Sequence, residues 1–77
     1  MEIMILGTGC PKCDRLLLNT EEALKQTAIV AEIKKVTRLK DIMKHNVMVT
    51  PALVVDGEVK SSGRILSVEQ IKDIITG

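Results

Sequence analysis

The chain has 77 residues and a formal net charge of +1, from eleven basic and ten acidic residues. This length predicts one domain, residues 1–77, and a domain of this size buries only about 60% of the surface of its unfolded chain. Phe, Tyr and Trp are absent, so aliphatic side chains must fill the core, and no site can depend on aromatic stacking. A near-neutral chain without aromatic residues is not expected to bind nucleic acid.

The apolar run near the N-terminus, Ile3 to Leu6, is too short for a signal peptide or a membrane span. We therefore expect a cytoplasmic protein without a membrane partner. The only cysteines are Cys10 and Cys13. Because lasting structural disulfides are rare in the cytosol, such a close pair predicts a catalytic or metal-binding role.

The first half of the chain predicts two strands around a long helix. Residues 2–6 are almost entirely apolar, which favours a strand that is central in its sheet. Apolar residues then recur every three or four positions as far as Ala28, which indicates a helix that begins at the cysteines. Pro11 suits its first position, where no backbone donor is needed. Residues 29–36 alternate as in a strand.

A short second helix is predicted for residues 38–44, with Thr37 as its cap and Asn46 as its end. Three of its apolar residues fall on one side of the helix: Leu39, Ile42 and Met43. Met4, Met43 and Met48 are interpreted as core residues, with Met48 also a candidate for a partner surface. His45 is given no catalytic role.

The last third of the chain predicts a hairpin and a helix. Residues 52–55 and 58–60 flank Asp56-Gly57, a strong hairpin signal because glycine accepts a positive φ. A loop is expected at residues 61–63. Ser67 and Gln70 match a capping box for a final helix, residues 68–76. The element order predicts an α/β fold with a four-stranded mixed sheet, helices on both faces and parallel first strands.

Cysteines three residues apart in a first helical turn can form a disulfide with little backbone movement. Cys10 would occupy the N-cap, where unpaired N–H groups and the helix dipole stabilise a thiolate. Cys10 is therefore the predicted nucleophile, and Cys13, one turn deeper, the resolving thiol. Lys12 adds a positive charge if it turns toward the sulfur.

The segment Cys10-Pro11-Lys12-Cys13, placed between a strand and a helix, resembles the active-site motif of the thioredoxin and glutaredoxin superfamily. Thr50-Pro51, ahead of the hairpin, resembles its second signature, a cis-proline that faces the disulfide. The resemblance covers nearly the whole chain. It implies the minimal thioredoxin fold of small, often archaeal, thioredoxin-like proteins known as redox-active disulfide proteins.

The resemblance implies a thiol-disulfide oxidoreductase that reduces protein disulfides with no metal or organic cofactor. Cys10 and Cys13 would be its redox-active disulfide, and substrate would contact Thr50, Pro51, Pro11 and Lys12. The implied partners are a disulfide-containing protein and a reductase such as thioredoxin reductase, and we expect a monomer.

Three alternatives remain open at this point. Glutathione-dependent, glutaredoxin-like activity is one, although the segments 7–9 and 61–64 differ from the glutathione-binding segments of glutaredoxins. A non-enzymatic metal-binding or metal-transfer module is another, because CxxC is half of a zinc site. It would need carboxylates or a dimer, since His45 is the only histidine. The third is an adaptor whose disulfide is never reduced.

Overall fold

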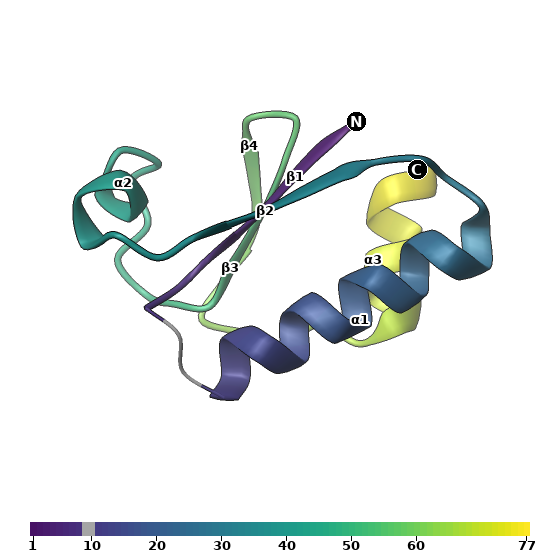
Figure 1. Cartoon of the computed structure of the whole chain (residues 1–77), viewed down its shortest axis with the longest axis horizontal. Coiled ribbons are helices and arrows are strands. Elements are labelled where there is room, and N and C mark those ends of the chain that lie inside the picture. Colours follow the sequence, from purple (N-terminus) through teal and green to yellow (C-terminus); the bar gives the residue numbers. More distant parts are fainter. Residues whose placement is uncertain (9–10) are drawn as a thin grey trace.

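The structure is a computed structural model that describes residues 1–8 and 11–77. Figure 1 shows a sheet with helices on both faces. This arrangement and the order of its elements confirm the predicted fold class. In chain order the elements are β1 (Glu2–Leu6), α1 (Pro11–Thr27), β2 (Glu32–Val36), α2 (Leu39–Met43), β3 (Ala52–Val55), β4 (Glu58–Ser62) and α3 (Val68–Thr76).

The sheet has the strand order β2-β1-β3-β4. The apolar strand β1 is central, as predicted. It runs parallel to β2, with Ile3 opposite Ile33, and antiparallel to β3, with Ile5 opposite Leu53. The short strands β3 and β4 form the antiparallel hairpin.

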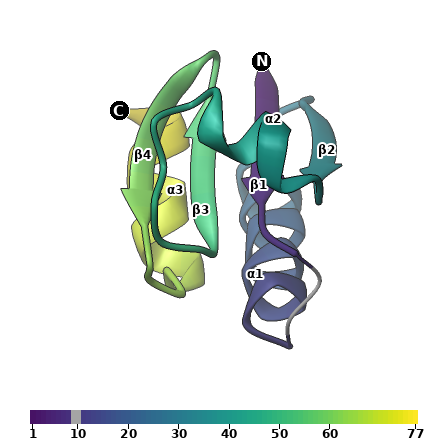
Figure 2. The ribbon, with the colours of Figure 1, turned by 90° about the vertical axis from the view of Figure 1, so that its left-hand side faces the viewer.

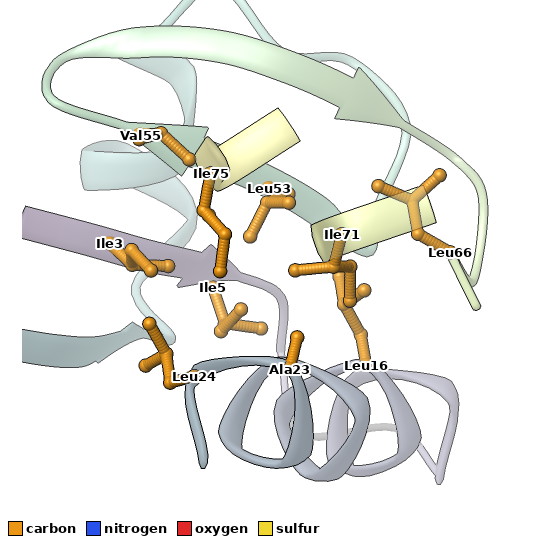
Figure 3. Packing of buried hydrophobic residues seen from close by; sticks show 10 residues of the cluster. All are labelled: Ile3, Ile5, Leu16, Ala23, Leu24, Leu53, Val55, Leu66, Ile71 and Ile75. Carbon is orange, nitrogen blue, oxygen red and sulfur yellow. The ribbon is translucent and has the colours of Figure 1, made fainter. Parts of the chain in front are cut away.

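Alternation along the strands divides the apolar residues between the two faces of the sheet. Ile3 and Ile5 of β1 lie in the larger cluster, beneath α1 and α3 (Figure 3). Both helices contribute fully buried side chains, for example Leu16 and Ile71. This cluster contains Ile3, Ile5, Leu16, Ala23, Leu24, Leu53, Val55, Leu66, Ile71 and Ile75. We call it the major core.

The other face of the sheet carries α2 and the segment after it, as Figure 2 shows. A smaller cluster lies there, and we call it the minor core. Its buried members are Leu6, Ile42, Val47, Ala52 and Val54. Of the five α2 residues, only Ile42 is buried. Leu39 is 63% exposed and Met43 is 62% exposed, so the prediction of Met43 as a core residue was wrong.

The hairpin turn confirms the Asp-Gly prediction. Asp56 and Gly57 both have positive φ, 50° and 81°, as a type I′ turn requires. The Asp56 side chain also accepts a hydrogen bond of 2.8 Å from the backbone N–H of Glu2. The second strand of the hairpin, β4, is longer than predicted. Ser61 and Ser62 pair with β3 beyond an irregularity in register, so the loop begins at Gly63.

Strand β2 and helix α2 are shorter than predicted. Residues 29–31 are not strand. The N–H of Ile29 still donates to the Leu24 carbonyl of α1, and the pairing with β1 begins at Glu32. The N-cap of α2 is Arg38, which makes no side-chain capping hydrogen bond. The prediction of Thr37 as the cap was therefore wrong. Asn46 has a φ of 58°, which agrees with its predicted role in ending the helical segment.

The last helix agrees with its prediction in detail. Ser67 is the N-cap of α3, and its hydroxyl accepts a hydrogen bond of 3.2 Å from the Gln70 N–H. The Gln70 side chain accepts one of 2.9 Å from the Ser67 N–H. This reciprocal capping fixes the start of the helix whose Ile71 and Ile75 enter the major core.

Candidate active site

Cys13 lies in the first turn of α1 with only 2% of its surface exposed. The helix stripe predicted from the sequence explains this position, because Cys13, Leu16 and Thr20 succeed one another on the buried side. Its sulfur is thus held on the inner side of the helix start, where a bulky disulfide substrate cannot reach it directly.

Gly7, directly after β1, is the point where three separate segments meet. Its N–H donates a hydrogen bond of 2.9 Å to the carbonyl of Val36, which extends the pairing of β1 with β2. A Cβ at Gly7 would overlap the Cys13 sulfur and would lie 3.2 Å from the Cys13 Cβ and 4.0 Å from the Thr50 Cβ. Only glycine leaves room for the sulfur here. Cys13 and Thr50, which are 37 positions apart in the sequence, therefore flank the same residue.

The peptide bond between Thr50 and Pro51 is cis, as the resemblance implied. Thr50 is half-buried and Pro51 is fully buried. The carbonyl of Pro51 accepts a hydrogen bond of 2.8 Å from the N–H of Gly63, at the end of β4. This bond ties the start of β3 to the end of its hairpin partner.

Gly63 was expected to be only a loop residue. Its φ is 73°, and a Cβ at this position would lie 2.6 Å from the Cγ1 of Val49. A side chain at residue 63 would therefore push against the segment that carries Thr50 and Pro51. No local sequence signal reveals this contact, because residues 49 and 63 meet only through the hairpin.

Pro11 and Lys12, the first residues of α1, are exposed. They are accessible to a molecule that approaches the helix start, which is where substrate contact was predicted. The predicted nucleophile, Cys10, lies outside the described residues, as does Gly9. Sequence alone places Cys10 directly before α1.

The nearest ion pair joins Asp14 of the same helical turn to Lys35 of β2, with 3.5 Å between the Lys35 Nζ and a carboxylate oxygen. Both side chains are largely exposed, so we expect the pair to contribute at most about 1 kcal/mol. It tethers the start of α1 to the edge strand only weakly.

A family model described as "Thioredoxin domain" matches residues 1–76. The chain belongs to the thioredoxin family. It is 42% identical to a protein named thioredoxin from Methanothermobacter thermautotrophicus over 76 residues, 99% of each chain. It is 44% identical over 71 residues to a thioredoxin from Methanocaldococcus jannaschii, which is 92% of this chain and 81% of that relative. Thiol-disulfide exchange is the activity typical of this thioredoxin family.

Two further observations concern possible metal ligands and membrane-spanning helices. Within residues 1–8 and 11–77, no three His, Cys, Asp or Glu side chains are grouped so that they could hold a metal ion. No helix in the described part of the chain is long and apolar enough to cross a membrane.

Proposed function

We propose that this thioredoxin-family chain reduces protein disulfides through Cys10 and Cys13 and needs no metal or organic cofactor. The observation that carries the proposal is the position of Cys13. Its sulfur is buried in the first turn of α1, against Gly7, beside the residue that precedes the cis-proline. Burial suits a resolving thiol and leaves Cys10 as the sulfur that meets the substrate.

In the proposed reaction, the Cys10 thiolate attacks one sulfur of a substrate disulfide. A mixed disulfide forms, and the other substrate sulfur leaves as a thiolate. Cys13 then loses its proton and attacks the Cys10 sulfur, which closes the Cys10–Cys13 disulfide and releases the second substrate thiolate. Two electrons pass to the substrate. A dithiol reductase of the thioredoxin reductase kind restores the pair by the reverse sequence.

Thr50, Pro51, Pro11 and Lys12 are the proposed substrate contacts. Thr50 is half-buried, and its backbone groups would pair with an extended substrate segment, with the buried Pro51 beside them. Pro11 and Lys12 are exposed at the start of the helix. The proposal includes a monomer that acts in the reducing cytosol, with a protein dithiol in preference to glutathione as its electron donor.

The test compares Cys10→Ser and Cys13→Ser in dithiol-driven reduction of insulin. Cys10→Ser should lose at least about 99% of the activity, because no thiolate is left to attack. Cys13→Ser should instead accumulate a covalent complex with an insulin chain, visible by mass spectrometry, because the mixed disulfide cannot be resolved. Denaturation curves of both variants control for folding. Full activity of folded Cys10→Ser would refute the proposal, and so would stoichiometric metal in the reduced wild type without any reductase activity.

A further inference from the structure

The surface around α2 exposes large apolar side chains close to the candidate site. Met48 is 98% exposed, and Leu39 and Met43 are each exposed by more than three fifths. Leu39 and Met43 are four positions apart, so they are neighbours on the helix surface, and both are exposed beside the buried Ile42. This five-residue helix buries Ile42 in the minor core and leaves the apolar side chains next to it in solvent.

A shallow hollow of about 340 Å³ lies between the end of α2 and the segment after it, lined by Met43, Asn46, Val47 and Met48. Val47 is only 5% exposed and belongs to the minor core. The hollow is therefore anchored on a buried residue, with two flexible methionines at its sides. Methionine side chains adapt to the shape of an inserted apolar group.

Basic residues are concentrated in the part of the sequence that contains α2, and three of them lie in ion pairs, Lys34 with Glu2, Lys35 with Asp14 and Lys44 with Asp41. Residues 33–50 contain five lysines or arginines and one acid, Asp41, a net charge of +4. The remainder contains six basic and nine acidic residues, a net charge of −3. Arg38 and Lys40 are exposed and have no ion-pair partner among residues 1–8 and 11–77. They flank Leu39, so unpaired positive charge borders the apolar side of α2.

The apolar and basic residues also lead directly into the site. Met48 precedes Thr50 by two positions, and Figure 2 shows the segment after α2 running down to the start of β3. A partner held on α2 would thus lie next to Thr50 and Pro51. The hollow is large enough to admit an apolar side chain. Nucleic acid is not a suitable partner, because the chain has no aromatic side chains that could stack on its bases.

We propose that the exposed side chains around α2 form a docking surface for an acidic segment of the disulfide-containing substrate protein, with one apolar side chain of that segment in the hollow. The residues of this surface are Arg38, Leu39, Lys40, Met43 and Met48. Positive charge beside the site accelerates encounter with such a partner, and the hollow selects the apolar residue. This inference rests on the proposed function, since it concerns the partner of the same thiol pair.

Two synthetic peptide disulfides serve as probes. Each is a disulfide-linked dimer of a short peptide with one cysteine and one leucine; one peptide carries four glutamates, and the other has glutamines instead. The measurement is the second-order rate constant for their reduction by the pre-reduced chain. At an ionic strength of about 0.01 M, where charges act over about 30 Å, we expect the acidic peptide to react about tenfold faster. At about 1 M the difference should disappear.

Variants then assign the preference to this surface. Arg38→Glu with Lys40→Glu should abolish the preference for the acidic peptide. Lys25→Glu with Lys60→Glu makes the same change in net charge elsewhere and should keep the preference at an ionic strength of about 0.1 M, where charges act over only about 10 Å. A third peptide has alanine in place of the leucine. Met48→Ser should slow reduction of the leucine peptide about threefold relative to reduction of the alanine peptide, because less apolar surface is buried. All variants should reduce neutral 2,2′-dithiodipyridine at the wild-type rate.

Several outcomes would overturn the docking surface. They are equal rates for the two peptides with the wild type, a preference that survives in the Arg38 and Lys40 variant, or a preference lost equally in the Lys25 and Lys60 control. Binding to phosphatidylserine vesicles through Arg38 and Lys40, without any peptide preference, would assign the surface to a membrane instead. Failure of the proposed function is a separate result, because reduction of 2,2′-dithiodipyridine would then not depend on Cys10.

Discussion

The two faces of the sheet are built to different depths. On one face, α1 and α3 pack against the sheet, and the ten residues of the major core lie between them and the strands, as Figure 3 shows. On the other face, the five-residue α2 lies over the minor core. Ile42 is the only residue of α2 that is buried there. The deep face provides most of the apolar burial that stabilises the fold. The shallow face leaves apolar and basic side chains in solvent beside the site, where a partner can use them.

The candidate site lies where the two faces join. Cys13 comes from α1, which covers the major core, and Thr50 comes from the segment that follows α2. Gly7 lies between them, at the end of the central strand. Cys13 is thus held by the side of the molecule with the larger core, and Thr50, a proposed substrate contact, by the side with the smaller core.

The largest expected effect is the loss of stability when a buried isoleucine is replaced by alanine in the major core, compared with the same replacement in the minor core. Ile71 of α3 and Ile42 of α2 are buried to 0% and 1% exposure. Ile→Ala at a buried site costs about 2–5 kcal/mol, depending on how far the cavity collapses. We expect about 4 kcal/mol for Ile71→Ala, between two helices and a sheet, and about 2 kcal/mol for Ile42→Ala, where a short helix can shift. Urea denaturation measures both, and equal losses would contradict a difference in depth between the faces.

The sequence predicted most of the deep face correctly, because long amphipathic patterns and local capping determine it. The apolar stripe that starts at Cys13 predicts α1, and the Ser67–Gln70 capping box predicts the start of α3. Neither needs information from elsewhere in the chain. The shallow face was predicted less well. Leu39 and Met43 share a helix side with an apolar pattern, but the pattern does not say how many of those side chains a five-residue helix can bury.

The site was predictable as motifs and not as contacts. The cysteine pair and Thr50-Pro51 were singled out from the sequence, and the structure places Cys13 and Thr50 on either side of Gly7. The need for glycine at positions 7 and 63 arises from residues far away in the sequence, Cys13 and Val49. Such contacts depend on the register of the sheet and the position of α1, which local sequence patterns do not encode.

The second prediction concerns the junction between the faces. Gly7→Ala should lower the free energy of unfolding by about 1–3 kcal/mol, because the added methyl group overlaps the Cys13 sulfur. In a Cys13→Ala background the same substitution should cost at least about 1 kcal/mol less, since the sulfur is absent. Chemical denaturation of the four proteins measures this coupling.

Gly57→Ala is the matched control for that cycle. A Cβ at Gly57 has no neighbour within 4 Å, and the cost of about 1 kcal/mol comes only from its positive φ. Its effect should therefore add to that of Cys13→Ala within about 0.5 kcal/mol. If Gly7→Ala is equally additive with Cys13→Ala, the sulfur is not what requires glycine at position 7.

The smallest expected effect contrasts the helix starts on the two faces. Ser67 caps α3 through a reciprocal pair of hydrogen bonds with Gln70, whereas α2 starts after Arg38 without any side-chain cap. Ser67→Ala should lower the free energy of unfolding by about 1 kcal/mol, because the Gln70 N–H loses its acceptor, the Ser67 hydroxyl. Thr37→Ala, which removes the hydroxyl predicted from sequence to cap α2, should change it by less than about 0.5 kcal/mol. A cost for Thr37→Ala as large as that for Ser67→Ala would show that α2 is anchored at its start as firmly as α3. The shallow face would then owe its exposed side chains to the shortness of α2 alone and not to a loosely held helix.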